Sequence, residues 1–545
     1  MKPFSPQRAV QAMTFLLFVA LLILTTFPLA SPVPVDAFLR MDPAAAIAAS
    51  LSARTLIPSL WPAAVLLMLT LILGRFFCGY VCPLGTAIDA ADAAMRRKRR
   101  RNAAGPAPAG WGRIQYLVLF FIIGAAALGI SFAWTTAPLV LVTRFFALVI
   151  YPVAALFGSA AAVLLRPAAD ITGLSGLAYL QVDIPRYALQ WFTLGTVGLI
   201  LAAGRIAPRC WCRYFCPAGA AFALFSIKPL LRRRVSDACY QCGECARGCP
   251  TEAIPADPFE TDFTACITCH ACERICPAGA VSFGAAARRR KWRPWLPERR
   301  QLLLAGLTGA GAAALTLTGL GRRRNDNAPG QLHPADLIRP PGAVPEPEFL
   351  ARCLRCGACM KACPTNTLQP MGLSAGIDMF FSPRVTPRRG PCEPLCNVCG
   401  EVCPTGAIRA IPPPEKIWAK IGTAQILRHK CLAWEFDRRC LVCDEVCPYD
   451  AISLNSVPEA KVPVPFVNES RCSGCGFCEH YCPVQARAAI IVEPMEALRL
   501  GEGSFREKAR AAGLDLRIDR RPPAEPYPDA EPEAAEAGLP PGFTE

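Results

Sequence analysis

The feature that most constrains this chain is a four-cysteine motif that occurs six times, each time with a proline after the last cysteine. Four copies have the spacing C-x2-C-x2-C-x3-C: Cys239, Cys242, Cys245 and Cys249; Cys266, Cys269, Cys272 and Cys276; Cys353, Cys356, Cys359 and Cys363; and Cys472, Cys475, Cys478 and Cys482. Two copies vary it: Cys392, Cys396, Cys399 and Cys403, and Cys431, Cys440, Cys443 and Cys447. In bacterial ferredoxins such motifs occur in pairs, and the fourth cysteine of one motif ligates the partner's [4Fe–4S] cluster.

Zinc and disulfide bonds are the alternatives to iron–sulfur clusters. Thiolates select either zinc or Fe–S clusters, but a zinc site needs only four ligands, usually as two C-x2-C pairs. Disulfides are typical of small secreted domains, and the 29 cysteines are an odd number. We therefore predict about six [4Fe–4S] clusters held by these 24 cysteines. In the last four motifs, either neighbours pair, or the first pairs with the fourth and the second with the third.

Other cofactors are not expected. Cys266, Cys269 and His270 fit the haem c pattern C-x-x-C-H, but they overlap a complete ferredoxin motif, so we predict no haem. No G-x-G-x-x-G follows a predicted strand, which argues against NAD, and no flavin-attachment pattern is expected. The histidines His270, His333, His429 and His480 are interpreted as solvent-facing or packing residues.

The composition predicts a membrane domain. The chain is 53% hydrophobic and only 18% charged, and apolar runs of spanning length cover 14–30, 56–74, 115–133 and 187–204. The basic run from Arg96 to Arg101 predicts a cytoplasmic loop, which puts the amino terminus inside and residues 31–55 outside. We interpret the net charge of +16 as an excess of arginine and lysine beside the membrane that sets this topology. Nucleic acid is not expected as a partner, because the basic runs flank apolar segments and are not interleaved with aromatics.

Two further apolar segments affect the topology. Residues 145–165 could also span, but the arginines at 205, 209, 213 and 232–234 would then lie outside, so we predict that 138–170 form a re-entrant or interfacial helix pair broken near Pro152. Residues 302–319 follow seven basic residues and are predicted to cross outward. Arg299 and Arg300 before them resemble a twin-arginine export signal; an ordinary stop-transfer flank is the alternative.

These patterns predict a polytopic α-helical membrane domain joined to α+β ferredoxin domains of the bacterial type. The predicted parts are a membrane domain with four or more transmembrane helices (1–235), a cytoplasmic two-cluster ferredoxin domain (236–285), a twin-arginine-like signal or anchor helix (299–325), a periplasmic four-cluster module (340–500) and a disordered tail (521–545). The predicted location is the bacterial inner membrane.

A second cysteine pattern, C-x3-C-P, lies just past two span ends. Cys78 and Cys82, in the stretch Arg75 to Gly85, are echoed by Cys212 and Cys216, in the stretch Arg209 to Gly219. These four thiols are redox candidates that could bind a further metal centre, form a redox disulfide or shape a quinone pocket. The plain alternative is packing, since free cysteines are often buried. Cys210 has no counterpart and is predicted to be structural.

Residues 1–290, with both C-x3-C-P motifs and two ferredoxin motifs, resemble the NapH/MauN type of membrane ferredoxin. Residues 299–500 resemble the NapG/MauM type of periplasmic ferredoxin, so the chain resembles a fusion of the two. The resemblance implies a quinol dehydrogenase component that takes electrons from the membrane quinone pool and passes them to a periplasmic oxidoreductase, nitrate reductase being the best-known acceptor. The insert 138–170 departs from a four-span core.

Two alternatives belong to other functional classes. One is a maturation or regulatory factor similar to the NosR or FixG/RdxA groups, which supplies electrons for a copper enzyme and shares both cysteine patterns. The other is an interaction subunit that anchors a periplasmic enzyme. An anchor would not need six clusters, and four cluster motifs beyond the export-like helix fit an electron conduit better.

Overall fold

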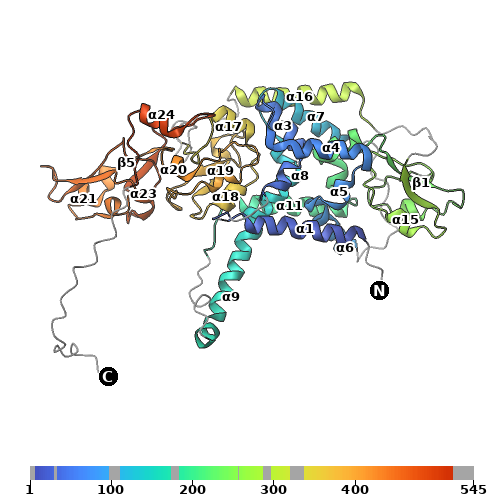
Figure 1. Ribbon diagram of the computed structural model, residues 1–545, viewed down its shortest axis with the longest axis horizontal. Coiled ribbons are helices and arrows are strands. Elements are labelled where there is room, and N and C mark those ends of the chain that lie inside the picture. Colours follow the sequence, from blue (N-terminus) through green and yellow to red (C-terminus); the bar gives the residue numbers. More distant parts are fainter. Residues whose placement is uncertain are drawn as a thin grey trace.

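The computed structural model describes residues 6–26, 28, 29, 34–96, 111–172, 183–255, 257–285, 296–318 and 337–518. These residues form three parts along one long axis (Figure 1). A helical bundle, the central bundle, lies in the middle. The two-motif domain (231–285) lies at one end, and the four-motif module (337–518) lies at the other. The basic run beyond Arg96, His333 and the predicted tail lie outside the described residues.

Three of the four predicted spans form helices that are shorter than their apolar runs. The bundle contains α1 (Pro6–Leu24), α3 (Pro43–Ser52), α4 (Trp61–Leu73), α6 (Pro83–Arg96), α7 (Ile114–Ala127), α11 (Gln190–Ala202), α13 (Pro217–Phe225) and α16 (Arg299–Leu317). Helices α4, α7 and α11 have 13 or 14 residues, about 20 Å each. Among the described residues, two helical stretches are long and apolar enough to cross a membrane, Pro6–Leu24 and Pro138–Pro167.

The prediction of a helix pair broken near Pro152 is wrong. Helix α8 (Pro138–Phe145) continues through the π-helical turn η4 (Phe146–Ile150) into α9 (Tyr151–Thr172). A proline interrupts the i→i−4 hydrogen bonds of an α-helix, and Pro152 directly follows a turn in which i→i−5 bonds replace them. Helix α9 then projects away from the bundle (Figure 1) with apolar side chains such as Phe157, which is 69% exposed.

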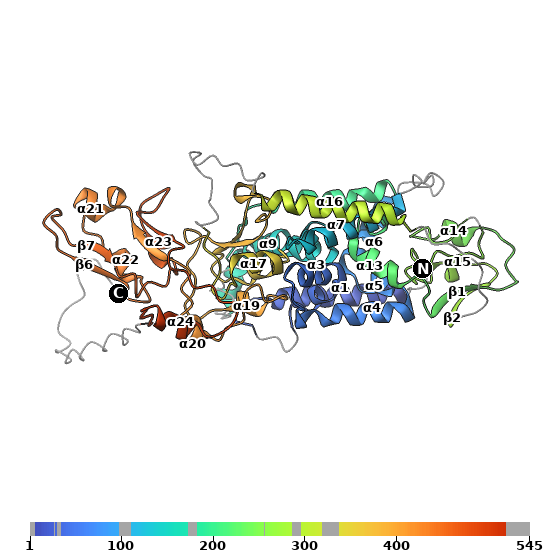
Figure 2. The same cartoon turned by 90° about the horizontal axis from the view of Figure 1, so that it is seen from above.

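Helix α16, which contains the twin-arginine-like segment, is packed into the bundle. It runs beside α7 along one side of the bundle (Figure 2). A Cβ atom on Gly124 of α7 would overlap the carbonyl oxygen of Gly306, and one on Gly309 would overlap that of Phe121. Close backbone contact between small residues is typical of helices that pack in membranes. A capping box between Glu298 and Gln301 fixes the start of α16.

Both ferredoxin parts are built from short helices and two-stranded antiparallel sheets. The sheets pair β1 (Leu231–Val235) with β2 (Val281–Ala285), β3 (Leu368–Pro370) with β4 (Pro383–Val385), β5 (Thr423–Ile426) with β8 (Ile490–Glu493), and β6 (Ile452–Asn455) with β7 (Val464–Val467). The short helices within the motifs are α14 (Glu244–Arg247), α15 (Ala271–Ile275), α18 (Ala358–Ala362), α19 (Val398–Glu401), α22 (Val442–Glu445) and α23 (Phe477–Tyr481). Beyond residue 500, α24 (Phe505–Ala511) packs onto the module through the fully buried Phe505.

Candidate iron–sulfur centres

Four cavities in the four-motif module are each lined by four cysteines, three from one motif and the last from its neighbour. The sets are Cys353, Cys356, Cys359 and Cys403 (the proximal set); Cys363, Cys392, Cys396 and Cys399 (the second set); Cys447, Cys472, Cys475 and Cys478 (the third set); and Cys431, Cys440, Cys443 and Cys482 (the distal set). Motifs therefore pair with their neighbours in sequence, which decides between the two pairings that the spacing allowed.

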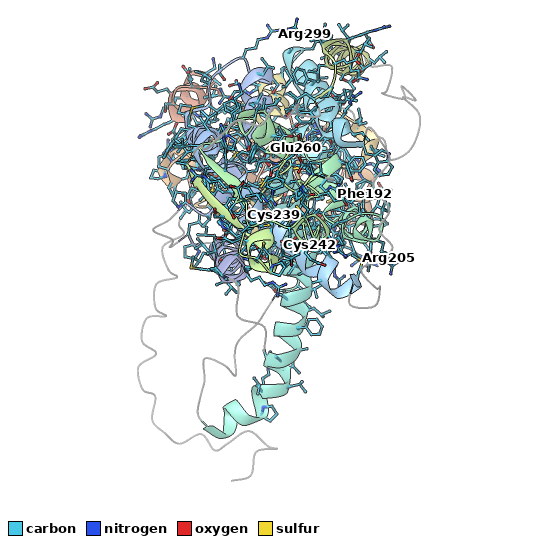
Figure 3. All side chains as sticks on the ribbon, turned by 90° about the vertical axis from the view of Figure 1, so that its right-hand side faces the viewer. Phe192, Arg205, Cys239, Cys242, Glu260 and Arg299 are labelled. Carbon is cyan, nitrogen blue, oxygen red and sulfur yellow. The ribbon has the colours of Figure 1, made fainter. Side chains whose placement is uncertain are left out.

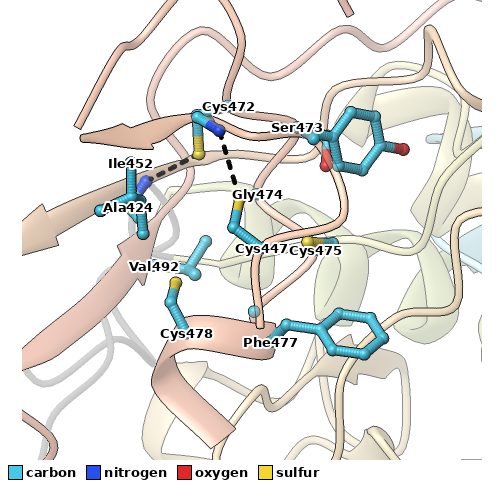
Figure 4. Close-up of a pocket in the computed structure, with 13 residues that line it drawn as sticks. Ala424, Cys447, Ile452, Cys472, Ser473, Gly474, Cys475, Phe477, Cys478 and Val492 are labelled. Carbon is cyan, nitrogen blue, oxygen red and sulfur yellow. Dashed lines mark hydrogen bonds between the residues drawn. The ribbon is translucent and has the colours of Figure 1, made fainter. Parts of the chain in front are cut away.

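The third set illustrates the local geometry. Its four cysteines surround one cavity, whose wall also includes the apolar Ile452 and Val492 (Figure 4). The backbone N–H of Ala424 donates a hydrogen bond to the Cys472 Sγ at 3.3 Å. In the described part of the chain no three His, Cys, Asp or Glu side chains converge on a single ion. Four soft sulfurs around a larger, mostly apolar cavity suit a multi-iron cluster.

Hydrogen bonds to sulfur recur at these thiols. Backbone N–H groups of Ala253, Ala451 and Ala489 donate to the sulfurs of Cys249, Cys447 and Cys482 at 3.3 to 3.4 Å. Two cationic side chains do the same: the Arg233 Nη2 donates to the Cys245 Sγ at 3.3 Å, and the Lys416 Nζ donates to the Cys392 Sγ at 3.5 Å. Such bonds help to set cluster potentials. Sequence reasoning missed both cations, because no motif links them to cysteines 12 and 24 residues away.

Burial favours the protonated form of three of the module thiols in the absence of a metal. It raises the pKa of Cys475 and of Cys443 to about 12, and that of Cys396 to about 11. Iron binds thiolates, so binding must displace these protons. The cavities therefore fit clusters whose own positive charge offsets the cost of burying thiolates, and such clusters accept and release one electron each when they are bound.

The two-motif domain pairs its motifs in the same way. The Cys249 thiol lies within electrostatic range of Cys266, Cys269 and Cys272, which together form the inner set. The side chain of Tyr240 lies near both Cys242 and Cys276, which places the last cysteine of the second motif beside the first motif. Cys239 and Cys242 lie at the outer end of the molecule, and Cys242 is exposed (Figure 3). The side chain of His270 contacts Glu273, with the His270 Nδ1 2.7 Å from the Glu273 Oε2.

The four thiols of the C-x3-C-P motifs also lie together, although they come from distant parts of the sequence. Cys78 lies in the short helix α5 (Phe76–Tyr80) and Cys212 in α12 (Cys210–Tyr214), while Cys82 and Cys216 directly precede α6 and α13. Cys82 and Cys216 are each within electrostatic range of both Cys78 and Cys212. Cys210 lies apart from them, in a small cluster with Ala207 and Tyr214.

Both ferredoxin parts contact the bundle directly. On the two-motif side, the Arg75 Nη1 donates to the Thr264 carbonyl at 2.6 Å and the Tyr80 hydroxyl to that of Thr268 at 3.0 Å. At the other end, the Arg144 Nε donates to the Arg355 carbonyl at 2.9 Å and the Lys361 Nζ to that of Thr25 at 2.9 Å. The proximal set therefore lies against the bundle.

Comparisons with known proteins agree with this geometry. Models described as a 4Fe-4S binding domain match residues 55–102 and 189–236, and residues 350–369. Models of a 4Fe-4S dicluster domain match 231–277 and 438–486. The methylamine utilization ferredoxin-type protein MauM of Methylorubrum extorquens is 37% identical over 223 residues, which are 96% of that protein and 39% of this chain.

The chain belongs to the MauM family of ferredoxin-type proteins. MauM of Paracoccus denitrificans is 40% identical over 184 residues, covering 80% of that protein and 32% of this chain. The ferredoxin-type protein NapG of Escherichia coli is 34% identical over 179 residues, covering 73% of NapG and 30% of this chain. As a MauM-family member, the chain is a ferredoxin-type electron-transfer protein with multiple [4Fe–4S] clusters. The MauM relatives cover well under half of it.

Proposed function

We propose that this chain carries electrons from membrane quinol, through six [4Fe–4S] clusters, to an oxidoreductase in the periplasm. The observation that carries the proposal is the continuity of the ligand sets. The proximal and second sets share one motif pair, and the third and distal sets share the other. The backbone N–H of Cys392 in the second set donates to the carbonyl of Cys475 in the third set at 2.8 Å, which joins the two pairs.

The membrane placement is part of the proposal. We place the central bundle across the inner membrane, with the amino terminus and the two-motif domain in the cytoplasm and the four-motif module in the periplasm. In support, α1 begins beside the two-motif domain, where the Arg274 Nη2 reaches the Gln7 Oε1 at 3.4 Å, and ends near Lys361 of the module. Large apolar side chains on the outer surface of the bundle, such as Leu199 at 73% exposure, fit contact with lipid.

The proposed donor and acceptor follow from the chain's resemblances. Residues 1–290 would act as the NapH/MauN-type membrane part, fused to a NapG/MauM-type module. Oxidation of one quinol releases two protons and two electrons, and clusters of this class carry one electron at a time. The exposed end of the module would meet the periplasmic acceptor, a nitrate-reductase-like oxidoreductase.

The experiment uses the full chain in lipid nanodiscs under anaerobic conditions. Addition of a menaquinol analogue should generate the EPR signals of reduced clusters in the module, and an added soluble acceptor should then remove them. Clusters that dithionite reduces but quinol does not would contradict the proposal and favour an assembly role. A Cys210→Ser variant is the matched control, because Cys210 is a buried thiol outside every predicted ligand set.

A further inference from the structure

We infer that Cys78, Cys82, Cys212 and Cys216 hold a seventh [4Fe–4S] cluster, inside the bundle and between the two ferredoxin parts. The two halves of this site, the C-x3-C-P site, are built alike. In each half one thiol lies on a five-residue helix and the second directly precedes a proline-initiated helix. The duplication brings two pairs of thiols together, which gives four sulfur ligands in one place.

The sulfurs are hydrogen-bonded as they are in the ferredoxin sets. The backbone N–H of Gly85 donates to the Cys82 Sγ at 3.4 Å, and that of Gly219 donates to the Cys216 Sγ at 3.2 Å. Each donor lies three residues after its cysteine, at the start of the following helix. The module thiols receive the same kind of bond from Ala451 and Ala424. Thiolate sulfur is a better acceptor than a thiol, so this pattern favours anionic ligands.

The surrounding charge points to a bound anion. Arg75 and Arg209, at 3% and 1% exposure, both lie within electrostatic range of Cys78. Arg209 forms a salt bridge with Asp89 at 2.5 Å and donates to the Cys78 carbonyl at 3.0 Å. Arg75 forms no salt bridge among the described residues, and its buried Nε has no hydrogen-bond partner there.

The guanidinium group of Arg75 lies beside the thiols of the C-x3-C-P site. Its Nη2 lies 2.7 Å from the point where a Cβ on residue 219 would be, so the glycine there makes room for the guanidinium beside Cys216. Asp262 is also within electrostatic range of Arg75, but its Oδ1 accepts hydrogen bonds from Thr264 and Ala265. A buried cation is costly without a compensating anion. Four thiolates around a cubane carry a net negative charge, whereas two disulfides or a neutral quinone would add no negative charge beside Arg75.

On the two-motif side, the site reaches the inner set. The Tyr80 hydroxyl, two residues after Cys78, donates to the carbonyl of Thr268, which precedes Cys269. Arg209 is within electrostatic range of Cys269 as well as of Cys78 and Cys212. One guanidinium thus lies within electrostatic range of both the C-x3-C-P thiols and the inner set.

On the module side, the contacts lead from Cys82 to the proximal set. Cys82 is within electrostatic range of Asp42, whose Oδ2 accepts the backbone N–H of Leu139 at 3.3 Å. Leu139 lies about 7.5 Å along α8 from Arg144, at 1.5 Å per residue. Arg144 in turn lies within electrostatic range of Cys353 and Cys356. The seventh cluster would therefore take one electron from one ferredoxin part and pass it to the other, a relay role that rests on the proposed function.

The test counts iron and sulfide in the purified full chain. We expect about 28 of each per chain, and a loss of about four of each in Cys78→Ser/Cys216→Ser, with no loss in Cys210→Ser. An unchanged iron content in the double variant would overturn the inference. If that variant does not fold, the wild type decides: after anaerobic acid release of iron, all four thiols should alkylate without a reductant. A Cys78–Cys82 or Cys212–Cys216 disulfide in that experiment would overturn it.

The same preparation separates this inference from the proposed function. A chain with about 28 irons whose clusters quinol cannot reduce would keep the seventh cluster and contradict the quinol-linked role. A chain with about 24 irons whose clusters quinol does reduce would contradict the seventh cluster and support the quinol-linked role.

Discussion

The four-motif module and the C-x3-C-P site each bring four thiols together, but they do so in different ways. In the module three cysteines of a set lie within one loop and short helix, and the fourth comes from the neighbouring motif. In the bundle, each half supplies two thiols, and Arg209 contacts the Cys78 carbonyl from 131 residues away. Module sites are therefore set largely by local sequence, whereas the bundle site exists only when the helices are packed.

The two regions also compensate charge differently. Module thiols receive backbone N–H bonds and, in the second set, one bond from Lys416. The bundle site adds two buried guanidinium groups, of which Arg209 alone has a salt-bridged carboxylate among the residues that the structure describes. The proximal set, which lies against the bundle, shares this feature, because the buried guanidinium groups of Arg144 and Arg355 lie within electrostatic range of Cys353. Cationic compensation is therefore a feature of thiols that are buried against the apolar helices.

The largest expected effect comes from interrupting the relay at its entry to the module. Cys356→Ser removes a ligand of the proximal set, the module set that lies against the bundle. We expect a loss of about four irons and loss of quinol-dependent reduction of the other three module sets. EPR of the quinol-treated chain measures this. In the matched variant Cys440→Ser, in the distal set, reduction of the remaining sets should persist; equal loss in both variants would contradict the linear order.

Charge compensation in the bundle is tested next. Arg75→Gln removes the cation that faces Cys78 and Cys216, so four thiolates would be buried with less positive charge around them. We expect a loss of about four irons, with partial retention in Arg75→Lys. Metal analysis and Mössbauer spectra measure the change. The Arg233→Gln variant removes a cation in the two-motif domain and should keep the cluster that Cys245 helps to hold. Loss of iron in both variants would contradict the claim that the bundle site depends more strongly on its cations.

The junction between bundle and module gives a smaller effect. Arg144 donates to the carbonyls of Trp134 and Arg355 at 2.8 and 2.9 Å. Arg144→Leu leaves these buried carbonyls without that donor, at a cost of about 1 to 3 kcal/mol. We expect faster hydrogen exchange in α18 and around Trp134, with unchanged exchange in the distal part of the module. Unchanged exchange in α18 would show that the contact contributes little.

The smallest effect concerns potentials within the module. The Lys416 cation stabilises the more negative, reduced form of a cluster held by Cys392, so Lys416→Gln should lower the second set's potential. A differential of about 1 kcal/mol corresponds to about 40 mV for one electron. Redox titration followed by EPR measures it, and Arg517→Gln, which removes an exposed cation paired with Asp515, is the control. A potential that stays constant or rises would contradict this role.

The sequence predicted the local parts of this molecule well, because their information is local. The spacing of Cys472, Cys475 and Cys478 identified three cysteines that do lie around one cavity. The same spacing did not identify the partner motif, because pairing depends on strand contacts such as β5 with β8. The repeated C-x3-C-P pattern was visible, but its convergence depends on helix packing. No sequence pattern indicated the roles of Arg75, Lys416 or Arg144, whose contacts are distant in sequence.

The helices of the bundle were predicted in position more accurately than in length or shape. The apolar runs gave α4, α7 and α11, but hydropathy does not report where prolines and 3-10 turns shorten a helix. The π-helical turn before Pro152 kept α8 and α9 continuous, and no composition rule predicts such a turn. The close packing of Gly124 against Gly306 depends on the neighbouring helix, which the chain supplies much later in the sequence.

The most direct test of the central claim, that the paired thiol sets hold iron–sulfur cubanes, is the metal and sulfide content of the anaerobically purified chain. The account predicts a brown protein with about 24 iron and 24 sulfide per chain from the six ferredoxin sets, rising to about 28 with the C-x3-C-P site, and only traces of zinc. A colourless protein that contains zinc in place of iron, or whose cysteines are joined in disulfides, would contradict it.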